Sequence, residues 1–252
     1  MGRIYVFVNQ KGGVGKTTSA LNIGAYLAEA GKSVLLVDFD AQANLSSGIG
    51  AAPSRPGIYE LLAGTAGVDE AIRRTKIPAL EVIPASIDLS GAAVELIEQD
   101  ERDLFLKKAL VPIRDRYDYI LIDCPPSLGV LTINGMAAAD AVFIPMQCEY
   151  FAMEGLSLLL QTIKRIQKSV NPPLAIGGIF FTMYDPRTRL AQDVVRNVSA
   201  YFKNRVFSTI IPRNVRLSEA PSHGLPISLY DPQCSGAKAY RSLAEEVVRR
   251  GA

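Results

Sequence analysis

The sequence predicts an α/β fold in which a mostly parallel β-sheet is covered by helices on both faces. Short apolar runs rich in β-branched residues alternate with longer segments of helical periodicity along the whole chain. A run that is apolar at every position is typical of a strand that is buried on both faces of a sheet. The alternation of such runs with helices favours crossovers between parallel strands. With 252 residues, 48% of them hydrophobic and 21% charged, the chain can bury a substantial core.

Each strand is predicted from an apolar run of the length that buried strands have. The six runs are Ile4–Val8, Val34–Val37, Leu80–Ile83, Tyr119–Ile122, Ala141–Ile144 and Ile176–Phe181.

Helices are predicted between these runs. The clearest covers 17–30, where apolar residues recur at three- and four-residue steps and Gly31 follows as a C-terminal cap. Residues 48–57, rich in Gly, Ala and Pro, are expected to form a surface loop. Since no repeat, low-complexity tract or linker divides the chain, we expect one domain over residues 1–252. Further helices are expected over 101–116, 154–170, 188–203 and 236–250.

The composition excludes several kinds of protein. The three cysteines, Cys124, Cys148 and Cys234, show no C-x-x-C spacing, and His223 is the only histidine. We therefore expect neither a zinc site nor a cysteine-ligated cluster within one chain, and reduced thiols suit the cytosol. No signal-peptide pattern is present, and no apolar stretch reaches the roughly 18 residues that would span a bilayer. A cytoplasmic protein is expected.

A glycine-rich loop follows the first predicted strand and precedes the first predicted helix. Its glycines, between Gln10 and Thr18, let backbone N–H groups point at a triphosphate at the positive end of that helix. Lys16 is placed to reach the β- and γ-phosphates, and the Thr17 hydroxyl is placed to bind Mg²⁺. The usual pattern has glycine where this sequence has Gln10, but strand, loop, Lys-Thr pair and helix occur in the required order.

Acidic residues follow two other predicted strands. Asp38 and Asp40 come after Val34–Val37, and Asp123 comes after Tyr119–Ile122. Ligands of open α/β sheets bind beyond the carboxyl ends of strands, where a carboxylate can hold the water shell of Mg²⁺. Extended backbone would direct Asp38 and Asp40 to the same side. The guanine-specific pattern Asn-Lys-x-Asp is absent, which favours ATP.

Three segments of the sequence resemble the deviant Walker A ATPases: KGGVGKTT at 11–18, VDFDAQ at 37–42 and IDCPPS at 122–127. The run IPRNVRLSEAPSHG at 211–224 is similar to that of the ParA/Soj-type chromosome-partitioning ATPases within that group. The resemblance covers essentially the whole chain. It implies the deviant Walker A P-loop NTPase fold, with ATP and Mg²⁺ as cofactors.

The resemblance also implies roles for single residues. Lys11 would cross a dimer interface to the partner's phosphates, and Gly12 would lie at that interface. Lys11, Lys16 and Asp40 would be catalytic, with Asp40 orienting the attacking water. Thr17 would bind Mg²⁺ directly, and Asp38 and Asp123 would act through water. The implied ATP site consists of Lys11, Gly12, Gly13, Val14, Gly15, Lys16, Thr17, Thr18, Pro212 and Asn214.

Charge is unevenly distributed along the chain. Residues 1–179 contain 16 basic and 19 acidic residues, whereas residues 180–252 contain 11 basic and 6 acidic. Such a surplus is by itself typical of a solvated face. No aromatic residues are interleaved for base stacking, so any DNA contact would be electrostatic and independent of sequence. The resemblance assigns DNA-backbone contacts to Arg187, Arg189, Arg213 and Arg216.

The implied partners follow from the family. ATP would drive formation of a homodimer that binds double-stranded DNA without sequence preference, and a ParB-type protein would stimulate hydrolysis and release. The protein would then be cytoplasmic and associated with the nucleoid. No arginine finger is evident in the loop, so weak intrinsic ATPase activity is expected.

Other functions of related ATPases were weighed against this one. MinD-type proteins bind membranes through a C-terminal amphipathic helix, but the apolar residues of this C-terminal segment are few and small, and we expect them to pack on the domain. A nitrogenase-type iron protein would bridge a cluster between subunits, whereas we expect Cys124 to be a buried thiol and His223 to be structural. An ATP-driven polymer is a third alternative.

Overall fold

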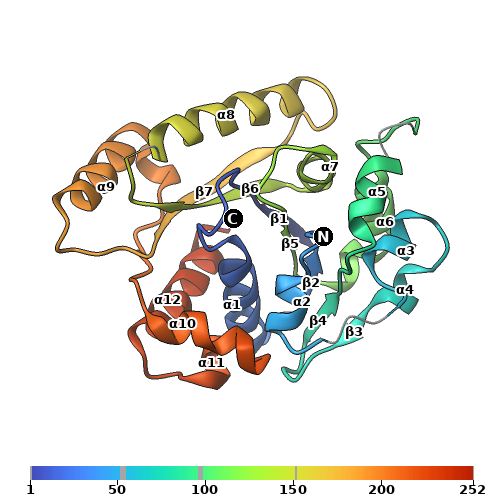
Figure 1. The fold of residues 1–252 in the computed structure, drawn as a ribbon, viewed down its shortest axis with the longest axis horizontal. Coiled ribbons are helices and arrows are strands. Elements are labelled where there is room, and N and C mark those ends of the chain that lie inside the picture. The colour runs from blue at the N-terminus through green and yellow to red at the C-terminus, as the bar shows by residue number, and fades with distance from the viewer. Residues whose placement is uncertain (1, 52–54, 96–98, 151, 252) are drawn as a thin grey trace.

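The computed structural model describes residues 2–51, 55–95, 99–150 and 152–251, and within them seven strands form one sheet (Figure 1). The strand order is β3-β4-β2-β5-β1-β6-β7. All paired neighbours run parallel except β3, a short edge strand antiparallel to β4. The predicted mostly parallel sheet is confirmed. The strands are β1 (Arg3–Phe7), β2 (Val34–Asp38), β3 (Arg73–Arg74), β4 (Leu80–Ile83), β5 (Tyr119–Asp123), β6 (Ala141–Gln147) and β7 (Ala175–Thr182).

Helices cover both faces of the sheet, as predicted. The long helices α8 (Ala152–Lys168) and α9 (Arg189–Phe202) lie along one face, and α1 (Lys16–Glu29) and α12 (Ser235–Arg250) pack together on the other (Figure 1). The remaining helices are α2 (Asn44–Gly48), α3 (Ile58–Leu62), α4 (Val68–Ala71), α5 (Leu89–Glu95), α6 (Phe105–Leu110), α7 (Val130–Ala138), α10 (Val215–Glu219) and α11 (Ile227–Tyr230), with 3₁₀ turns η2 (Val111–Arg116), η3 (Lys203–Arg205) and η4 (Ala220–His223).

The core consists of two apolar layers, one on each face of the sheet. In β1, Tyr5 and Phe7 pack into the layer beneath α1 and α12, while Ile4 and Val6 pack into the layer beneath α7 and α8. Successive residues of a strand point to opposite faces, so a strand buried on both faces must be apolar at every position. This requirement explains the uninterrupted apolar runs of the sequence.

The predicted boundaries lie within two residues of the observed ones except in a few places, and the helix α7 was not predicted. The helix expected over 101–116 is α6 followed by the 3₁₀ turn η2, because Pro112 has no N–H to continue an α-helix. β6 extends beyond the predicted Ile144 to Gln147. The loop expected over 48–57 begins after Gly48, which ends α2, and its residues 52–54 lie outside the described part of the chain.

The segments that carry the expected site residues meet at the carboxyl ends of the central strands. β5 lies between β1 and β2, with Asp123 paired in register with both Phe7 and Asp38. Parallel strands end at the same edge of a sheet, so the loop after β1, Asp38 and Asp123 are neighbours although they are far apart in the sequence.

Candidate functional site

The glycine-rich loop connects β1 to α1 in the conformation that its glycines permit. Gly13 has φ of +72° and Gly15 has φ of +87°, in the left-handed region that favours glycine. Gly15 precedes the first turn of α1, and no side chain of the described residues caps its N–H groups. These donors, at the positive end of a helix, form a site for an anion.

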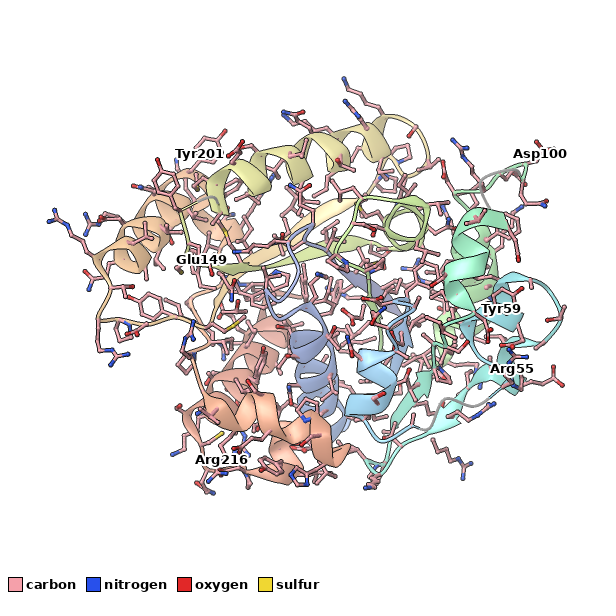
Figure 2. All side chains as sticks on the ribbon, in the orientation of Figure 1. Arg55, Tyr59, Asp100, Glu149, Tyr201 and Arg216 are labelled. Carbon is pink, nitrogen blue, oxygen red and sulfur yellow. The ribbon has the colours of Figure 1, made fainter. Side chains whose placement is uncertain are left out.

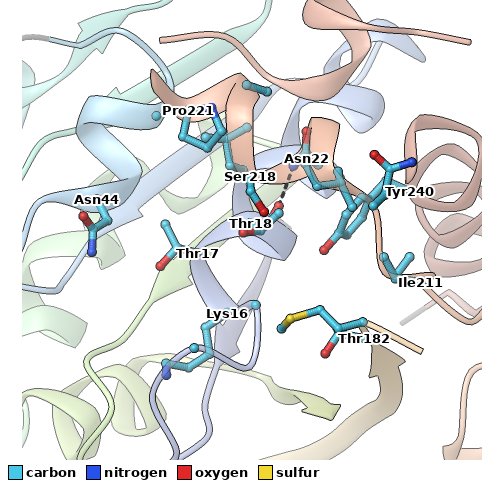
Figure 3. A pocket seen from close by; sticks show the side chains of 18 of the residues that line it. Lys16, Thr17, Thr18, Asn22, Asn44, Thr182, Ile211, Ser218, Pro221 and Tyr240 are labelled. Atoms are coloured by element: carbon cyan, nitrogen blue, oxygen red, sulfur yellow. Dashed lines mark hydrogen bonds between the residues drawn. The ribbon is translucent and has the colours of Figure 1, made fainter. Parts of the chain in front are cut away.

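A cavity of about 650 Å³ opens in front of this loop. It is bordered by the N-terminal turns of α1, by α2 and by the segment from Ile211 to Leu225. Figure 3 shows Lys16 and Thr17 on one side of the cavity and Ile211 and Tyr240 on the other. The volume lies within the range of small-ligand sites. Nine residues of the expected site line the cavity: Gly12, Gly13, Gly15, Lys16, Thr17, Thr18, Asp40, Pro212 and Asn214.

Lys16 lies almost entirely within the protein, with 6% of its surface exposed. Its Nζ donates to the carbonyl oxygen of Lys11 at 3.3 Å. Burial lowers the pKa of Lys16, while the nearby Asp123 opposes that change. An ammonium carries three donors, so a lysine held here can also bind the phosphates of a nucleotide.

Asp38 and Asp123 lie side by side at the ends of β2 and β5, and both are fully buried. Burial raises the pKa of Asp38 to about 6, although donors from Ser46 oppose the rise. Burial also raises the pKa of Asp123 well above its usual value, reinforced by the charge of Asp38 and opposed by Thr17 and Lys16. Neither carboxylate oxygen of Asp123 has a hydrogen-bond partner among the described residues.

This pair of carboxylates fits a hard cation. A buried carboxylate without partners is costly, and a divalent ion beside Asp123 would remove that cost. The described residues contain no group of three or more His, Cys, Asp or Glu side chains that could hold a metal alone. Mg²⁺ suits the remaining arrangement, because it keeps waters and binds phosphates together with few protein ligands. Thr17, Asp38 and Asp123 are the residues that would hold it.

Asp40 lies just beyond the end of β2 and lines the cavity. Its backbone N–H donates to Asp38 Oδ1 at 3.3 Å, and its own Oδ1 accepts from the N–H of Gln42 at 3.1 Å. Its negative charge adds to the rise in the Asp38 pKa, which is caused chiefly by burial. Asp40 thus presents a carboxylate to the cavity.

Lys11 and Gly12 lie at the outer rim of the loop. The Lys11 ammonium is paired with the carboxylate of Glu149, and the two side chains are about half exposed, 51% and 52%. Glu149 follows β6 and is labelled in Figure 2. Gly12 has ample space within its own chain, since an added Cβ would meet only Pro126, at 3.8 Å. No close contact within the described part of the chain therefore requires glycine at this position.

Neighbouring strands anchor the loop. Thr182, at the end of β7, donates its hydroxyl to the Val14 carbonyl oxygen at 2.8 Å, and Val14 itself is buried. Asn9 accepts from the Lys11 N–H at 3.0 Å and donates to the Pro145 carbonyl oxygen at 2.9 Å. Val14, expected to belong to the ATP site, is therefore buried and is not among the residues that line the cavity.

Apolar side chains border the far side of the cavity. Leu217, Pro221 and Tyr240 line it together with Pro212 and Asn214. Asn214 caps α10 by accepting from the Arg216 N–H at 2.9 Å, and its amide donates to Ser235 Oγ at 2.9 Å.

Two segments that border the cavity, the one that follows α2 and the one that follows η4, are in contact through their main chains. Gly50 follows α2, and Gly224 follows η4. A Cβ added to Gly50 would lie 2.9 Å from the Gly224 carbonyl oxygen, and one added to Gly224 would lie 2.9 Å from the Gly50 Cα. The φ angles of both residues are also positive. Glycine is required here for close approach as well as for conformation.

The four expected DNA-binding arginines are exposed but differ in their partners. The Arg189 side chain is 95% exposed and lies 3.9 Å from Asp193, whereas Arg187 forms a closer ion pair with Asp185, at 2.6 Å. Arg216 pairs with Glu219 at 2.9 Å and Asp231 at 3.5 Å, at the surface of the helices that follow β7 (Figure 2). Arg213 is exposed, and its N–H donates to the Tyr184 carbonyl oxygen, close to the Asp185–Arg187 turn.

Two expectations about other residues can be compared with the structure. Cys124 is fully buried, which confirms the expected buried thiol, and burial raises its pKa well above the usual value. Of the four apolar residues of α12 that were expected to pack on the domain, Leu243, Ala244 and Val247 are buried on the face of the sheet that α1 also covers, whereas Val248 is 39% exposed. Within the described residues, no helix has the length and apolar character needed to cross a membrane.

Sequence reasoning missed two polar residues of the site. Thr182 ends an apolar strand, so the strand-end rule that identified Asp38 and Asp123 could also have indicated it. Ser46 is fully buried beside Asp38, but no motif or spacing marked it.

Several known proteins are similar to this chain in sequence or in structure. An AAA domain family model matches residues 2–176. The chromosome-partitioning ATPase Soj of Treponema pallidum is 65% identical over 99% of this chain and 98% of its own length. The chromosome partitioning protein ParA of Caulobacter vibrioides is 52% identical over 98% of this chain and 94% of its own. The solved structure of cobyrinic acid a,c-diamide synthase from Mycobacterium smegmatis, with bound ADP and magnesium, is 38% identical, with a TM-score of 0.87 and coverage of 100% and 96%.

Proposed function

Since this chain belongs to the family of ParA and Soj chromosome-partitioning ATPases, we propose that it is an ATP-driven switch for DNA partitioning. In this proposal ATP joins two copies into a sandwich dimer that binds DNA without sequence preference. Hydrolysis, stimulated by a ParB-type partner, then releases the DNA. The identities of 65% and 52% to partitioning ATPases favour this function over that of the synthase, which is 38% identical.

The observation that carries the proposal is the convergence of a phosphate loop and two buried carboxylates at adjacent strand ends. Lys16 and the N–H groups of the loop would bind the phosphates of ATP. Thr17, with Asp38 and Asp123 acting through water, would hold Mg²⁺, which neutralises charge on the phosphates when bound. Asp40 would orient the attacking water, because its carboxylate lines the same cavity.

The dimer is supported by the rim of the loop. Lys11 lies outside the cavity and is half exposed, where it could reach a second copy. Gly12 has room for a side chain within its own chain, so a facing molecule would account for the glycine. One chain alone would leave part of the negative charge of the triphosphate uncompensated. A cation supplied by the partner would compensate it, so association would depend on a bound triphosphate.

DNA binding is supported by the position and exposure of the arginines. Arg187 and Arg213 lie on neighbouring segments, and Arg189 begins α9 with an almost fully exposed side chain. Phosphate contacts of this kind carry no sequence information. A dimer presents two such sets, which turns weak binding by each chain into avidity.

A membrane-positioning function of the MinD type finds less support. Most of the apolar face of α12 packs against the domain, and the exposed Val248 alone does not form an apolar stripe of the kind that inserts into lipid. Partner stimulation fits the absence of an arginine from the phosphate loop at 9–18. A basic segment of the partner could supply such a charge, which is worth about 10³–10⁵ in rate where it is known.

The test is sedimentation of the wild type and Asp40→Ala with ATP or ADP, with and without random duplex DNA. We expect Asp40→Ala with ATP to form a stable dimer that remains on DNA, and ADP to leave both proteins monomeric. A variant that binds Mg·ATP as a monomer would refute the dimer, and a dimer that ignores DNA at low salt would refute the DNA function. Liposome co-sedimentation with ATP tests the membrane alternative.

A further inference from the structure

The buried hydroxyl of Ser46 is bound to one oxygen of Asp38. Ser46 Oγ donates to Asp38 Oδ2 at 2.6 Å, and the Ser46 backbone N–H donates to the same oxygen at 2.8 Å. Ser46 Oγ also accepts from the Ala85 N–H at 3.0 Å, and Ser46 is 0% exposed. The hydroxyl thus accepts from the Ala85 N–H with a lone pair and donates its single proton to Asp38.

These contacts make the two oxygens of Asp38 unequal. Oδ2 receives two short hydrogen bonds from Ser46, whereas Oδ1 receives only the longer bond from the Asp40 N–H, at 3.3 Å, among the described residues. Asp123, which pairs in register with Asp38, receives no side-chain hydrogen bond from the described residues. One carboxylate of the pair is thus fixed through one oxygen, and the open acceptors are Asp38 Oδ1 and both oxygens of Asp123.

We propose that Ser46 is a positioning residue for magnesium, because its hydroxyl holds the Asp38 carboxylate so that Oδ1 is left for the hydrated cation. This inference rests on the proposed nucleotide site and assigns a residue that no motif of the family resemblance includes. The outer partners of metal-binding groups fix the orientation of those groups, and losing one typically lowers metal affinity by about 10–100-fold.

The position of Ser46 also connects this carboxylate to the rest of the site. Ser46 belongs to α2, whose neighbouring residues Asn44, Ser47 and Gly48 line the cavity. Through Ala85 the same hydroxyl is tied to the chain that follows β4. The Ser46 hydroxyl oxygen therefore joins three segments: the end of β2, helix α2 and the residues that follow β4.

The test compares wild type, Ser46→Ala, Ser46→Thr and Ser228→Ala. Binding of a fluorescent ADP analogue is measured over a range of Mg²⁺ concentrations and in EDTA, and thermal unfolding of the nucleotide-free proteins is measured in parallel. Ser228→Ala is the matched control, because it removes a buried hydroxyl that has no hydrogen-bond partner among the described residues.

We expect Ser46→Ala to raise the Mg²⁺ concentration for half-maximal enhancement of binding by about tenfold or more, with binding in EDTA unchanged. Ser46→Thr keeps the hydroxyl and should restore the wild-type midpoint, and Ser228→Ala should not change it. A folded Ser46→Ala with the wild-type midpoint would overturn the inference, even if its unfolding temperature fell. Should Ser46→Ala fail to fold, Ser46→Cys supplies only a weak donor and must show the same shift.

The outcome also separates this inference from the proposed function. If ADP binding by the wild type does not depend on Mg²⁺, the magnesium site itself is wrong and the inference falls with it. If the wild type depends on Mg²⁺ and Ser46→Ala has the same midpoint, only the role of Ser46 is refuted. ADP binding requires neither dimerisation nor DNA, so failure of those parts of the proposed function leaves this test intact.

Discussion

Glu149 should restrain dimerisation, because it holds the lysine that is proposed to reach the second copy. The Lys11 ammonium pairs with Glu149 of its own chain, and each side chain is about half exposed. Lys11 must leave this partner before it can contact a nucleotide across the interface. Glu149→Gln keeps the shape of the side chain and removes its charge, so we expect the variant to dimerise at a lower protein concentration than the wild type.

The magnitude follows from the exposure of the pair. Exposed ion pairs contribute about 0.2–1 kcal/mol, which corresponds to a factor of about 1.4–5 for each chain. A symmetric dimer breaks two such pairs, so the dimerisation constant should increase by about 2–30-fold. The effect should shrink at high salt, since exposed charges are screened.

The assay is the ATP-dependent monomer–dimer equilibrium of Glu149→Gln in an Asp40→Ala background, measured by sedimentation at several protein concentrations. Glu154→Gln is the matched control, because it removes one exposed negative charge from the same region, and among the described residues Lys11 pairs with Glu149 and not with Glu154. Lys11→Ala should bind ATP and remain monomeric. An unchanged or weakened dimer in Glu149→Gln would refute the reasoning.

Three further predictions concern DNA binding, ATP affinity and stability. Arg189→Ala should weaken binding to all duplex sequences about equally and reduce the slope of log affinity against log salt by about 1, measured by fluorescence anisotropy; a loss confined to one sequence would indicate base recognition instead. Arg216→Ala should in addition lower ATP affinity, since the Arg216 side chain pairs with Glu219 at the C-terminal end of α10, the helix that Asn214 of the cavity caps, whereas Arg189→Ala should not. For Glu246, burial alone would raise the pKa, but hydrogen bonds from Ser208 and Thr209 lower it to about 2, below its usual 4.5. A lowered pKa in the folded state means that the carboxylate stabilises the protein fully above about pH 4.5 and loses this contribution as the pH falls toward 2. Glu246→Gln should therefore cost about 1.5–3 kcal/mol in urea unfolding at pH 7 and much less near pH 3; an equal cost at both pH values would contradict the assigned pKa.

The sequence predicted the sheet well because its strands are buried on both faces. Such strands must be apolar throughout, and β4 was located to the residue. Short helices such as α2 and α4 were missed, since four or five residues are too few to show helical periodicity. The edge strand β3 consists of two arginines, which carry no strand signal at all.

The candidate site was predictable where one local rule sufficed. Asp38 and Asp123 each follow an apolar strand, and the glycines precede a Lys-Thr pair. The partners of these residues depend on the tertiary fold instead. Ser46 reaches Asp38 only because α2 turns back over the end of β2, and Glu149 reaches Lys11 only because β6 lies beside β1. No property of either residue in the linear chain indicates these pairings.

The contact between Gly50 and Gly224 limits how this cavity can diverge. The segment that follows α2 and the segment that follows η4 meet here through bare backbone, and a Cβ at either position would overlap the other main chain. The distance between these two segments is therefore set by their backbones and not by their side chains. If the cavity binds a nucleotide as proposed, we expect a change of base preference to come from substitutions of lining residues such as Leu217 or Ser218, and not from a wider cavity.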